Sequence, residues 1–309
     1  MKILVTGVYG FIGFSVARRL LDLGHEVIGI ERITNSKSEK TERIKLLEGR
    51  AGFTVYDSDL SNFNKTKELL MALDFDLVLH LAGQYSVPYS EDAVLSFVDG
   101  NVRSWVHIMH IAHLKKIKRV VYASSTHVPE SEDPANMYGA TLKFREIASR
   151  TYNGMGIQTV AIRYSTTYGP YMRADSPQAQ IMKLVYHQKE INLESGAFSG
   201  AYSWVHISDA VEITIRALLN EVKTDHVIVT AVANEESQSL RRCLQLVEEY
   251  SGKKAVTKGN YPEIPDGRKP EKQLAELKEQ FGYVPQVDAR IGIKEYVDWY
   301  LSEGKRCSQ

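Results

Sequence analysis

Cysteine is scarce in this sequence, with Cys243 and Cys307 as the only two among 309 residues. Two cysteines are too few for a disulfide framework and lack the spacing of metal ligands. Neither sign of charge is in excess, because 38 lysines and arginines balance 38 aspartates and glutamates. That balance predicts no binding to nucleic acid or to an anionic membrane. No apolar run approaches the ~20 residues of a membrane span, so we expect a cytoplasmic protein.

The sequence also lacks a cluster of residues suited to hold a metal ion. His107, His110 and His113 recur every third residue, a spacing that drifts around a helix. No group of carboxylates accompanies them. We therefore expect no metal site.

Short apolar runs alternate with amphipathic stretches through the first half of the chain. The runs predicted to form buried strands are Ile3–Thr6, Glu26–Ile30, Asp76–Leu81, Arg119–Ser124 and Gln158–Arg163. The stretches predicted to form helices are Phe11–Leu23, Asn101–Leu114 and Tyr138–Tyr152. This alternation is typical of α/β proteins in which helices cover both faces of a doubly wound parallel sheet. One such domain accounts for residues 1–165.

The alternation becomes less regular after residue 165. The elements predicted there are a strand end and helix at Val205–Asn220, a strand at His226–Thr230, and two helices at Leu240–Ser251 and Pro270–Gln280. Part of 200–232 is expected to return to the sheet of the first domain. Residues 166–309 are therefore expected to form mainly a smaller carboxy-terminal lobe, interleaved with that domain.

The strongest single motif is Gly7-Val8-Tyr9-Gly10-Phe11-Ile12-Gly13, between the first predicted strand and helix. Glycines in such a turn let backbone N–H groups approach a pyrophosphate at the helix N-terminus. Glu31 ends the second predicted strand. A carboxylate there accepts hydrogen bonds from the adenosine ribose and repels a 2′-phosphate, whereas the adjacent Arg32 would favour one. Together these residues predict a Rossmann domain that binds NAD in preference to NADP.

Further motifs follow in order along the chain. They are Asp59-Leu60, His80-Leu81-Ala82-Gly83, Gln84, Val87, Ser90, Asn101-Val102, Ser124-Ser125, Tyr138-Gly139-Ala140-Thr141, Arg163, Tyr168-Gly169-Pro170 and Asp209. With the glycine motif, this series resembles the extended short-chain dehydrogenase/reductase family, the NAD-dependent nucleotide-sugar epimerases and dehydratases, over nearly the whole chain. The resemblance implies that the NAD contacts are made by Gly7, Tyr9, Gly10, Phe11, Ile12, Gly13, Glu31, Asp59, Leu60, Leu81, Ala82, Gly83, Tyr138 and Lys143.

The same resemblance gives Tyr138 the role of the base that takes a proton from a sugar hydroxyl, with Ser125 sharing that oxygen. An unperturbed tyrosine titrates near ~10, so it needs positive charge nearby to act at neutral pH. The family has a lysine four residues after this tyrosine, but here Leu142 stands there and Lys143 follows. We favour a π-bulge that lets Lys143 reach the site. The alternatives are that the lysine's role is lost or that another lysine enters the site.

Other departures from the family lie toward the substrate, which the resemblance implies is a nucleotide-diphosphate sugar. Its implied contacts are Val87, Ser90, Ser125, Thr166, Tyr202 and Arg268. Thr166 replaces a family asparagine, and Tyr202 replaces an arginine. Thr126 and His127 occupy the positions of the dehydratase acid/base pair, which argues against an ordinary 4,6-dehydratase. His127 stays a candidate acid or base, because an unperturbed histidine titrates near ~6.5.

These features favour an NAD-dependent nucleotide-sugar epimerase that acts through a transient 4-keto sugar. One alternative is an enzyme of the same family that oxidises, dehydrates or decarboxylates the sugar. Another is a catalytically lapsed NAD-binding homologue, which Leu142, Thr166 and Tyr202 would suit.

The resemblance further implies a homodimer, joined by a four-helix bundle to which each subunit gives Asn101–Leu114 and Tyr138–Tyr152. An apolar stripe runs along the first of these helices, formed by Trp105, Ile108, Ile111 and Ala112. Burial in the core of a monomer explains that stripe equally well.

Overall fold

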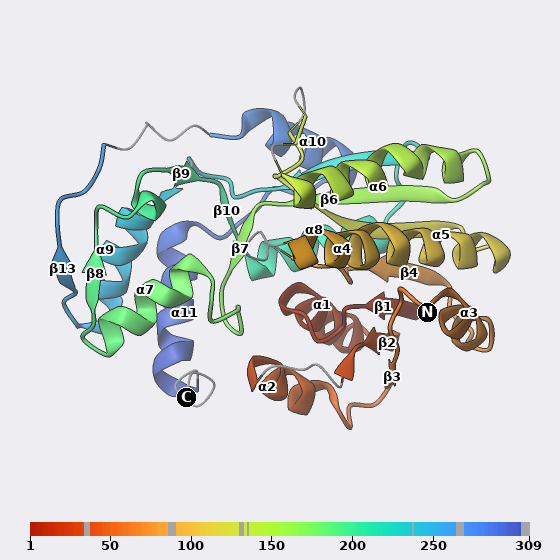
Figure 1. Cartoon of the computed structure of the whole chain (residues 1–309), viewed down its shortest axis with the longest axis horizontal. Coiled ribbons are helices and arrows are strands. Elements are labelled where there is room, and N and C mark those ends of the chain that lie inside the picture. Colours follow the sequence, from red (N-terminus) through yellow and green to blue (C-terminus); the bar gives the residue numbers. More distant parts are fainter. Residues whose placement is uncertain are drawn as a thin grey trace. The chain divides into compact units, whose positions relative to one another are not determined.

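The computed structural model describes residues 1–33, 38–85, 91–129, 133–134, 136–236, 238–263 and 269–303 (Figure 1). The chain divides into two compact units. The first comprises Met1–Tyr164 and Val211–Thr230, and the second comprises Ser165–Ala210 and Ala231–Gln309. The chain therefore leaves the first unit, returns to it once, and ends in the second.

A seven-stranded sheet forms the centre of the first unit, in the order β11-β6-β5-β4-β1-β2-β3. Its strands are β1 (Lys2–Thr6), β2 (Glu26–Glu31), β3 (Phe53–Asp57), β4 (Leu77–His80), β5 (Arg119–Ser125), β6 (Gln158–Tyr164) and β11 (His226–Ala231). β1 pairs in parallel with both β2 and β4, where the strand order reverses. This order confirms the predicted doubly wound Rossmann fold, whose ligands bind at the carboxyl ends of the strands near the reversal.

Helices connect these strands and cover the sheet. They are α1 (Phe11–Asp22), α2 (Ser38–Leu47), α3 (Phe63–Met71), α4 (Glu91–Phe97), α5 (Ser104–Leu114), α6 (Met137–Asn153) and α8 (Ile207–Leu219). Helix α5 packs against both α3 and α6. The predicted stripe on α5 lies in the core, because Trp105, Ile108, Ile111 and Ala112 are each at most 1% exposed. The stripe is therefore part of the hydrophobic core of one chain and is not an open surface for dimer contacts.

One wide turn interrupts the helix predicted over Asn101–Leu114. Helix α4 runs into a π-helical turn, η2 (Val98–Arg103), before α5 begins at Ser104. The turn contacts α4, α5 and α6. Turns of this kind are rare and occur frequently at functional sites.

The second unit is built from short strand pairs and helices. Its strands are β7 (Thr166–Tyr168), β8 (Glu190–Asn192), β9 (Ala201–Tyr202), β10 (Trp204–His206), β12 (Gln238–Ser239) and β13 (Val256–Lys258), and its helices are α7 (Pro177–Tyr186), η3 (Gly196–Phe198), α9 (Leu240–Ser251), α10 (Glu271–Phe281) and α11 (Ala289–Ser302). The strands pair as β10 with β7, β12 with β9, and β13 with β8.

Both helices predicted after Ser239 are present, as α9 and α10, and α11 is a third helix that the sequence did not predict. Asp288 caps this helix by accepting a hydrogen bond from the Ile291 backbone N–H at 2.9 Å. Helix α11 packs on α9, which also contacts α7. Its aromatic residues Tyr296, Trp299 and Tyr300 are weak helix formers, and they obscured the helical pattern in the sequence.

Candidate functional site

The glycine motif forms the turn between β1 and α1. Gly7 has a φ of 70°, and a Cβ there would lie 2.8 Å from the Ala82 nitrogen. A Cβ on Gly13 would overlap the Gly7 carbonyl oxygen. Gly10 is the N-cap of α1 and has no side chain to cap the first turn. The N–H groups that begin α1 are therefore left for an anionic ligand, as a pyrophosphate site requires.

Glu31 lies at the end of β2 and faces this turn. Its Oε2 accepts a hydrogen bond from the Tyr9 backbone N–H at 3.2 Å, and its Oε1 accepts one from Lys40 Nζ at 3.1 Å. The Tyr9 side chain is fully buried, and burial, followed by the charges of Glu48 and Glu31, raises the pKa of its phenol to about 12. Lys40 is a neighbour that sequence reasoning missed, because it lies on α2, which the sequence did not predict.

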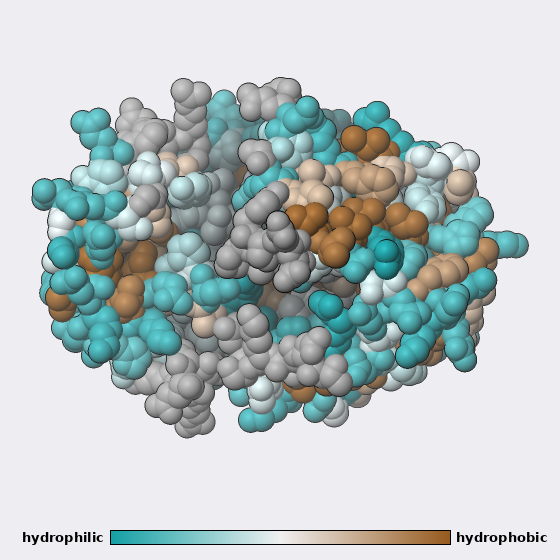
Figure 2. All heavy atoms as spheres, in the orientation of Figure 1, coloured by the Kyte–Doolittle hydropathy of each residue, from teal (hydrophilic) through white to brown (hydrophobic). Residues whose placement is uncertain are grey.

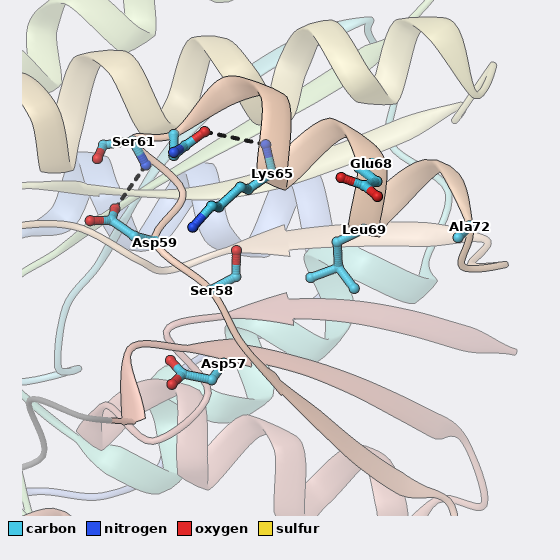
Figure 3. A pocket seen from close by; sticks show the side chains of 9 residues that line it. Asp57, Ser58, Asp59, Ser61, Lys65, Glu68, Leu69 and Ala72 are labelled. Atoms are coloured by element: carbon cyan, nitrogen blue, oxygen red, sulfur yellow. Dashed lines mark hydrogen bonds between the residues drawn. The ribbon is translucent and has the colours of Figure 1, made fainter.

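An open pocket of about 780 Å³ lies beside the carboxyl end of β3 and the start of α3 (Figure 3). Its lining residues are Asp57, Ser58, Asp59, Ser61, Asn62, Lys65, Glu68, Leu69 and Ala72. Figure 3 shows the Lys65 side chain extending toward Asp59. Burial opposes charge on Asp59, but hydrogen bonds from Ser61 and the charge of Arg32 keep its pKa below the ordinary value. The predicted adenine contact Asp59 thus stays ionised at neutral pH, and the following Leu60 is buried.

The segment after β4 closes the other side of the glycine turn. Thr6 Oγ1 lies 2.8 Å from His80 Nδ1 and accepts a hydrogen bond from the Ala82 backbone N–H at 3.2 Å. A Cβ on Gly83 would lie 2.7 Å from Asn101 Oδ1, so a side chain there would displace the Asn101 amide. These contacts hold the predicted NAD-binding segment, Leu81 to Gly83, against the ends of β1 and η2.

Three of the predicted chemical groups come together where β5 ends and α6 begins. Ser125 Oγ lies 3.1 Å from His127 Nδ1, and the rings of His127 and Tyr138 are 5.5 Å apart. A Cβ on Gly139 would overlap the His127 carbonyl oxygen, so this glycine allows the turn to approach the helix. Thr126, which lies between Ser125 and His127 in the sequence, has an exposed side chain. The geometry unites Ser125, His127 and Tyr138 in one cluster.

Aromatic rings surround Tyr138 on its other sides. Tyr85 lies edge-on at 5.8 Å between ring centroids, and Phe97 at 6.1 Å. Helix α6 is capped one residue before its start by Asn136, which accepts a hydrogen bond from the Gly139 backbone N–H at 2.8 Å. Tyr138 is therefore held in the first turn of a capped helix, beside the end of β5.

The predicted π-bulge beside Lys143 is wrong. Helix α6 is a regular α-helix from Met137 to Asn153, with Leu142 buried on its inner side. Lys143 Nζ lies 2.9 Å from the exposed carboxylate of Asp133. A residue five places after Tyr138 is rotated from it by about 140°, and no extra residue in this helix removes that rotation.

A buried ion pair fixes the inner face of α6 to the sheet. Glu146 accepts hydrogen bonds from Arg163 Nε at 2.8 Å and Nη2 at 2.6 Å. Ser124 Oγ also donates to Glu146 at 2.6 Å. The pair joins α6 to β5 and β6 and so fixes the helix that carries Tyr138 against the strand that ends in Ser125.

The remaining predicted substrate residues fall into two groups. In the second unit, Thr166 is partly buried on β7, opposite Trp204, and Tyr202 on β9 is 48% exposed. Val87, Ser90 and Arg268 lie outside the described residues. In the part of the chain that the structure describes, no cluster of histidine, cysteine and carboxylate groups could hold a metal ion. Within that same part, no helix is long and apolar enough to cross a membrane.

A comparison of the sequence with known protein families identifies the family of this chain. Residues 3–231 match the NAD dependent epimerase/dehydratase family. This chain belongs to that family. Membership confirms the predicted resemblance to extended short-chain dehydrogenases/reductases, the enzyme class and NAD as the cofactor. The glycine turn, which side chains would block, and Glu31 at the end of β2 fit that cofactor.

Individual relatives extend the likeness to nearly the full chain. A UDP-glucuronate 4-epimerase of Thermodesulfobacterium geofontis is 27% identical, over 96% of this chain and 95% of that protein. UDP-glucuronate 4-epimerase 2 of Arabidopsis thaliana is 28% identical, over 99% of this chain and 77% of that protein. The solved UDP-glucuronic acid 4-epimerase of Bacillus cereus, in complex with UDP-glucuronic acid and NAD, superposes with a TM-score of 0.82 at 24% identity. The superposition covers 97% of this chain and 98% of the Bacillus cereus chain. At that identity the structural likeness establishes the fold.

Proposed function

We propose that this protein is a nucleotide-sugar 4-epimerase that acts through a transient 4-keto sugar, with UDP-glucuronate as its first candidate substrate. The observation that carries the proposal is the cluster of Ser125, His127 and Tyr138 at the carboxyl end of the sheet, on the side that holds the glycine turn. Relatives named UDP-glucuronate 4-epimerases over nearly the full chain support the choice of sugar.

The proposed chemistry begins with proton removal from the C4 hydroxyl by Tyr138. Ser125 donates a hydrogen bond to the same oxygen and positions it. When bound, NAD would supply the acceptor for the hydride that leaves C4 and the donor that returns it to the opposite face, once the 4-keto sugar has rotated in the site. Tyr138 then returns the proton to the oxygen. His127, 3.1 Å from Ser125, orients that hydroxyl and is the second candidate for the proton transfer.

The cofactor would be held by the segments of the first unit described above. The turn from Gly7 to Gly13 would hold the pyrophosphate, and Glu31 the adenosine ribose. Asp59 and Leu60 would contact the adenine, and Leu81 to Gly83 the other half of the molecule. Lys143 remains a proposed cofactor contact from the family resemblance, although its ion pair with Asp133 points to a role on the helix surface.

The family resemblance supplies the proposed contacts of the nucleotide-diphosphate sugar. These are Thr166 and Tyr202, together with Val87, Ser90 and Arg268. Thr126 and His127 provide no carboxylate pair after Ser125. Because dehydration needs a separate acid and base to remove water, the lack of the carboxylate pair at these positions favours epimerisation over dehydration.

The purified protein should invert C4 of UDP-glucuronate and yield an equilibrium mixture of the two epimers. Incubation with UDP-, GDP- and dTDP-sugars, followed by NMR of the products, tests this directly. An inverted sugar supports the proposal. Loss of water or carbon dioxide, or release of a 4-keto sugar, would assign the chain to another reaction of the family. Absence of turnover despite NAD binding would mark it as catalytically lapsed.

We also propose that the protein is a homodimer through the exposed face of α4 and α6. Leu95, Phe144 and Ile147 on these helices are 69%, 41% and 62% exposed. Figure 2 shows a hydrophobic patch over this group of helices. Apolar surface of this kind on a helical face is typical of subunit interfaces.

Sedimentation at micromolar concentration should therefore give about twice the mass of one chain. Ile147→Glu should shift the protein toward monomer, because a charge would be buried in the interface. Glu212→Gln, on the partly exposed side of α8, serves as a control for a charge change elsewhere. A wild-type monomer at that concentration would contradict the proposal.

A further inference from the structure

Arg145 lies on the same side of α6 as Tyr138. Seven residues separate them, a rotation of about 700°, which is about 20° short of two full turns. Side chains on a helix lean toward its N-terminus, so the long arginine reaches back over the turn that contains Leu142. Arg145 is 1% exposed, so its charge is held inside the protein. Its side chain therefore reaches back toward position 142, where the family resemblance places a lysine.

Backbone carbonyls from three elements hold the guanidinium. Arg145 Nε donates to the Asn101 carbonyl at 2.6 Å, Nη1 to the Ala123 carbonyl at 3.2 Å, and Nη2 to the Ala82 carbonyl at 3.4 Å. Asn101 belongs to the π-helical turn η2, Ala123 precedes Ser125 on β5, and Ala82 follows β4. The cation thus sits where the predicted NAD-binding segment meets the strand that ends in Ser125.

No acid in the described part of the chain neutralises the positive charge of Arg145. Among the described residues, no carboxylate forms an ion pair with it, and its acceptors are neutral carbonyls and the Asn101 amide. The adjacent Glu146 is already bound by Arg163 at 2.6 Å. A buried cation without an anionic partner is costly, which makes it a candidate for a functional role.

Three titratable groups act on or near this cation, namely Tyr138, Tyr122 and His80. Because Tyr122 and His80 stay neutral, Tyr138 is the group whose charge Arg145 can stabilise. Burial lowers the pKa of Arg145 to about 10, and negative charge on Tyr138, and then on Tyr122, opposes that shift. Burial also raises the pKa of Tyr122 far above its ordinary value, so that phenol stays neutral. Burial and the charge of Arg145 hold the pKa of His80 well below its usual range, so this imidazole adds no charge.

We propose that Arg145 is a positioning residue for Tyr138: its buried guanidinium stabilises the phenolate that starts the proton transfer, in place of the lysine that Leu142 replaces. This role rests on the proposed function. Tyr85, Phe97 and His127 face the Tyr138 ring from the other elements. Neither Tyr85 nor Phe97 can supply a positive charge. The ion pair of Lys143 with Asp133 reduces the positive charge that this lysine offers to Tyr138.

Titration of Tyr138 in the NAD-loaded protein tests the proposal without any sugar substrate. Its signal in ¹³C-tyrosine NMR is identified by its loss in Tyr138→Phe. In Arg145→Gln, which keeps an N–H donor for the carbonyls but removes the charge, the Tyr138 pKa should rise by roughly one to three units. Adding Leu142→Lys to that variant should bring the pKa back down. Arg150→Gln, on the exposed face of the same helix, should leave it unchanged.

An unchanged Tyr138 pKa in folded Arg145→Gln would overturn the proposal. If that variant does not fold, Lys143→Met decides the question. A rise in the Tyr138 pKa there would assign the charge to Lys143 and contradict the proposal, and an unchanged value would support Arg145. Failure of the sugar assays would not affect this readout, because the titration needs only the NAD-bound protein. In an active enzyme, the acid limb of the kcat profile should move upward in Arg145→Gln and return in the double variant.

Discussion

Tyr138→Phe should lower kcat for epimerisation by at least ~10²-fold while leaving the affinity for NAD near that of the wild type. Loss of a positioned acid/base costs about this much, because phenylalanine has no group to accept or return the proton. The ring itself stays in place among Tyr85, Phe97 and His127, so the site keeps its shape. Steady-state kinetics and calorimetric titration with NAD measure the two quantities.

Tyr152→Phe is a matched control, since Tyr152 lies on the same helix and packs against Trp105, away from the cluster. It should leave kcat within about twofold of the wild type, as expected for a substitution outside the reacting groups. Wild-type turnover in Tyr138→Phe would place the proton transfer elsewhere. His127, beside Ser125, would then be the first residue to substitute.

Gly10→Leu should weaken NAD binding by at least about 10²-fold, or ~2.7 kcal/mol, without unfolding the protein. Gly10 has φ −65° and ψ 162°, a conformation open to any residue. A Cβ there meets the Gly7 carbonyl at 3.0 Å, which requires only a small local shift. The larger side chain would occupy the path by which the pyrophosphate reaches the start of α1. Gly7 and Gly13 are less informative, because substitution there disturbs the backbone itself.

Gly154→Ala provides the control for glycine loss. Gly154 ends α6 with a φ of −59°, and a Cβ would meet the Thr151 carbonyl at 3.4 Å, an ordinary contact. Its affinity for NAD in calorimetry and its melting temperature should match those of the wild type. Tight NAD binding by Gly10→Leu would show that the pyrophosphate does not pass this turn.

The sequence predicted the central strands because their burial leaves an unbroken apolar run. All four residues of β4 are buried, as are four of the five in β1. Strand β3 at the sheet edge is only partly buried, so its pattern is weak and it was not predicted. Helix α2 was missed for a similar reason, and with it Lys40, the partner of Glu31. Periodicity detects burial, and elements with little of it give little signal.

The surroundings of Tyr138 were predicted only in part. The motif series identified Tyr138, Ser125 and His127 by type, and the structure brings them together. The bulge was expected in α6 because Lys143 follows Leu142 there, whereas the wide turn at Val98–Arg103 has no sequence signature and was not predicted. Arg145 was passed over because a charged residue within a helix ordinarily lies on its surface. Its position seven residues after Tyr138, which places both side chains on one side of the helix, was the signal that the sequence offered.

In the proposed epimerisation, the hydrogen that leaves C4 of the nucleotide sugar returns to the same carbon within one closed site. UDP-glucuronate carrying deuterium at C4, incubated with the purified protein in ordinary water, tests it most directly. Direct hydride return yields a product that is inverted at C4 and still carries the deuterium there, as NMR and mass spectrometry would show. An inverted product that has exchanged its deuterium for solvent hydrogen, or a product with no inversion, would contradict it.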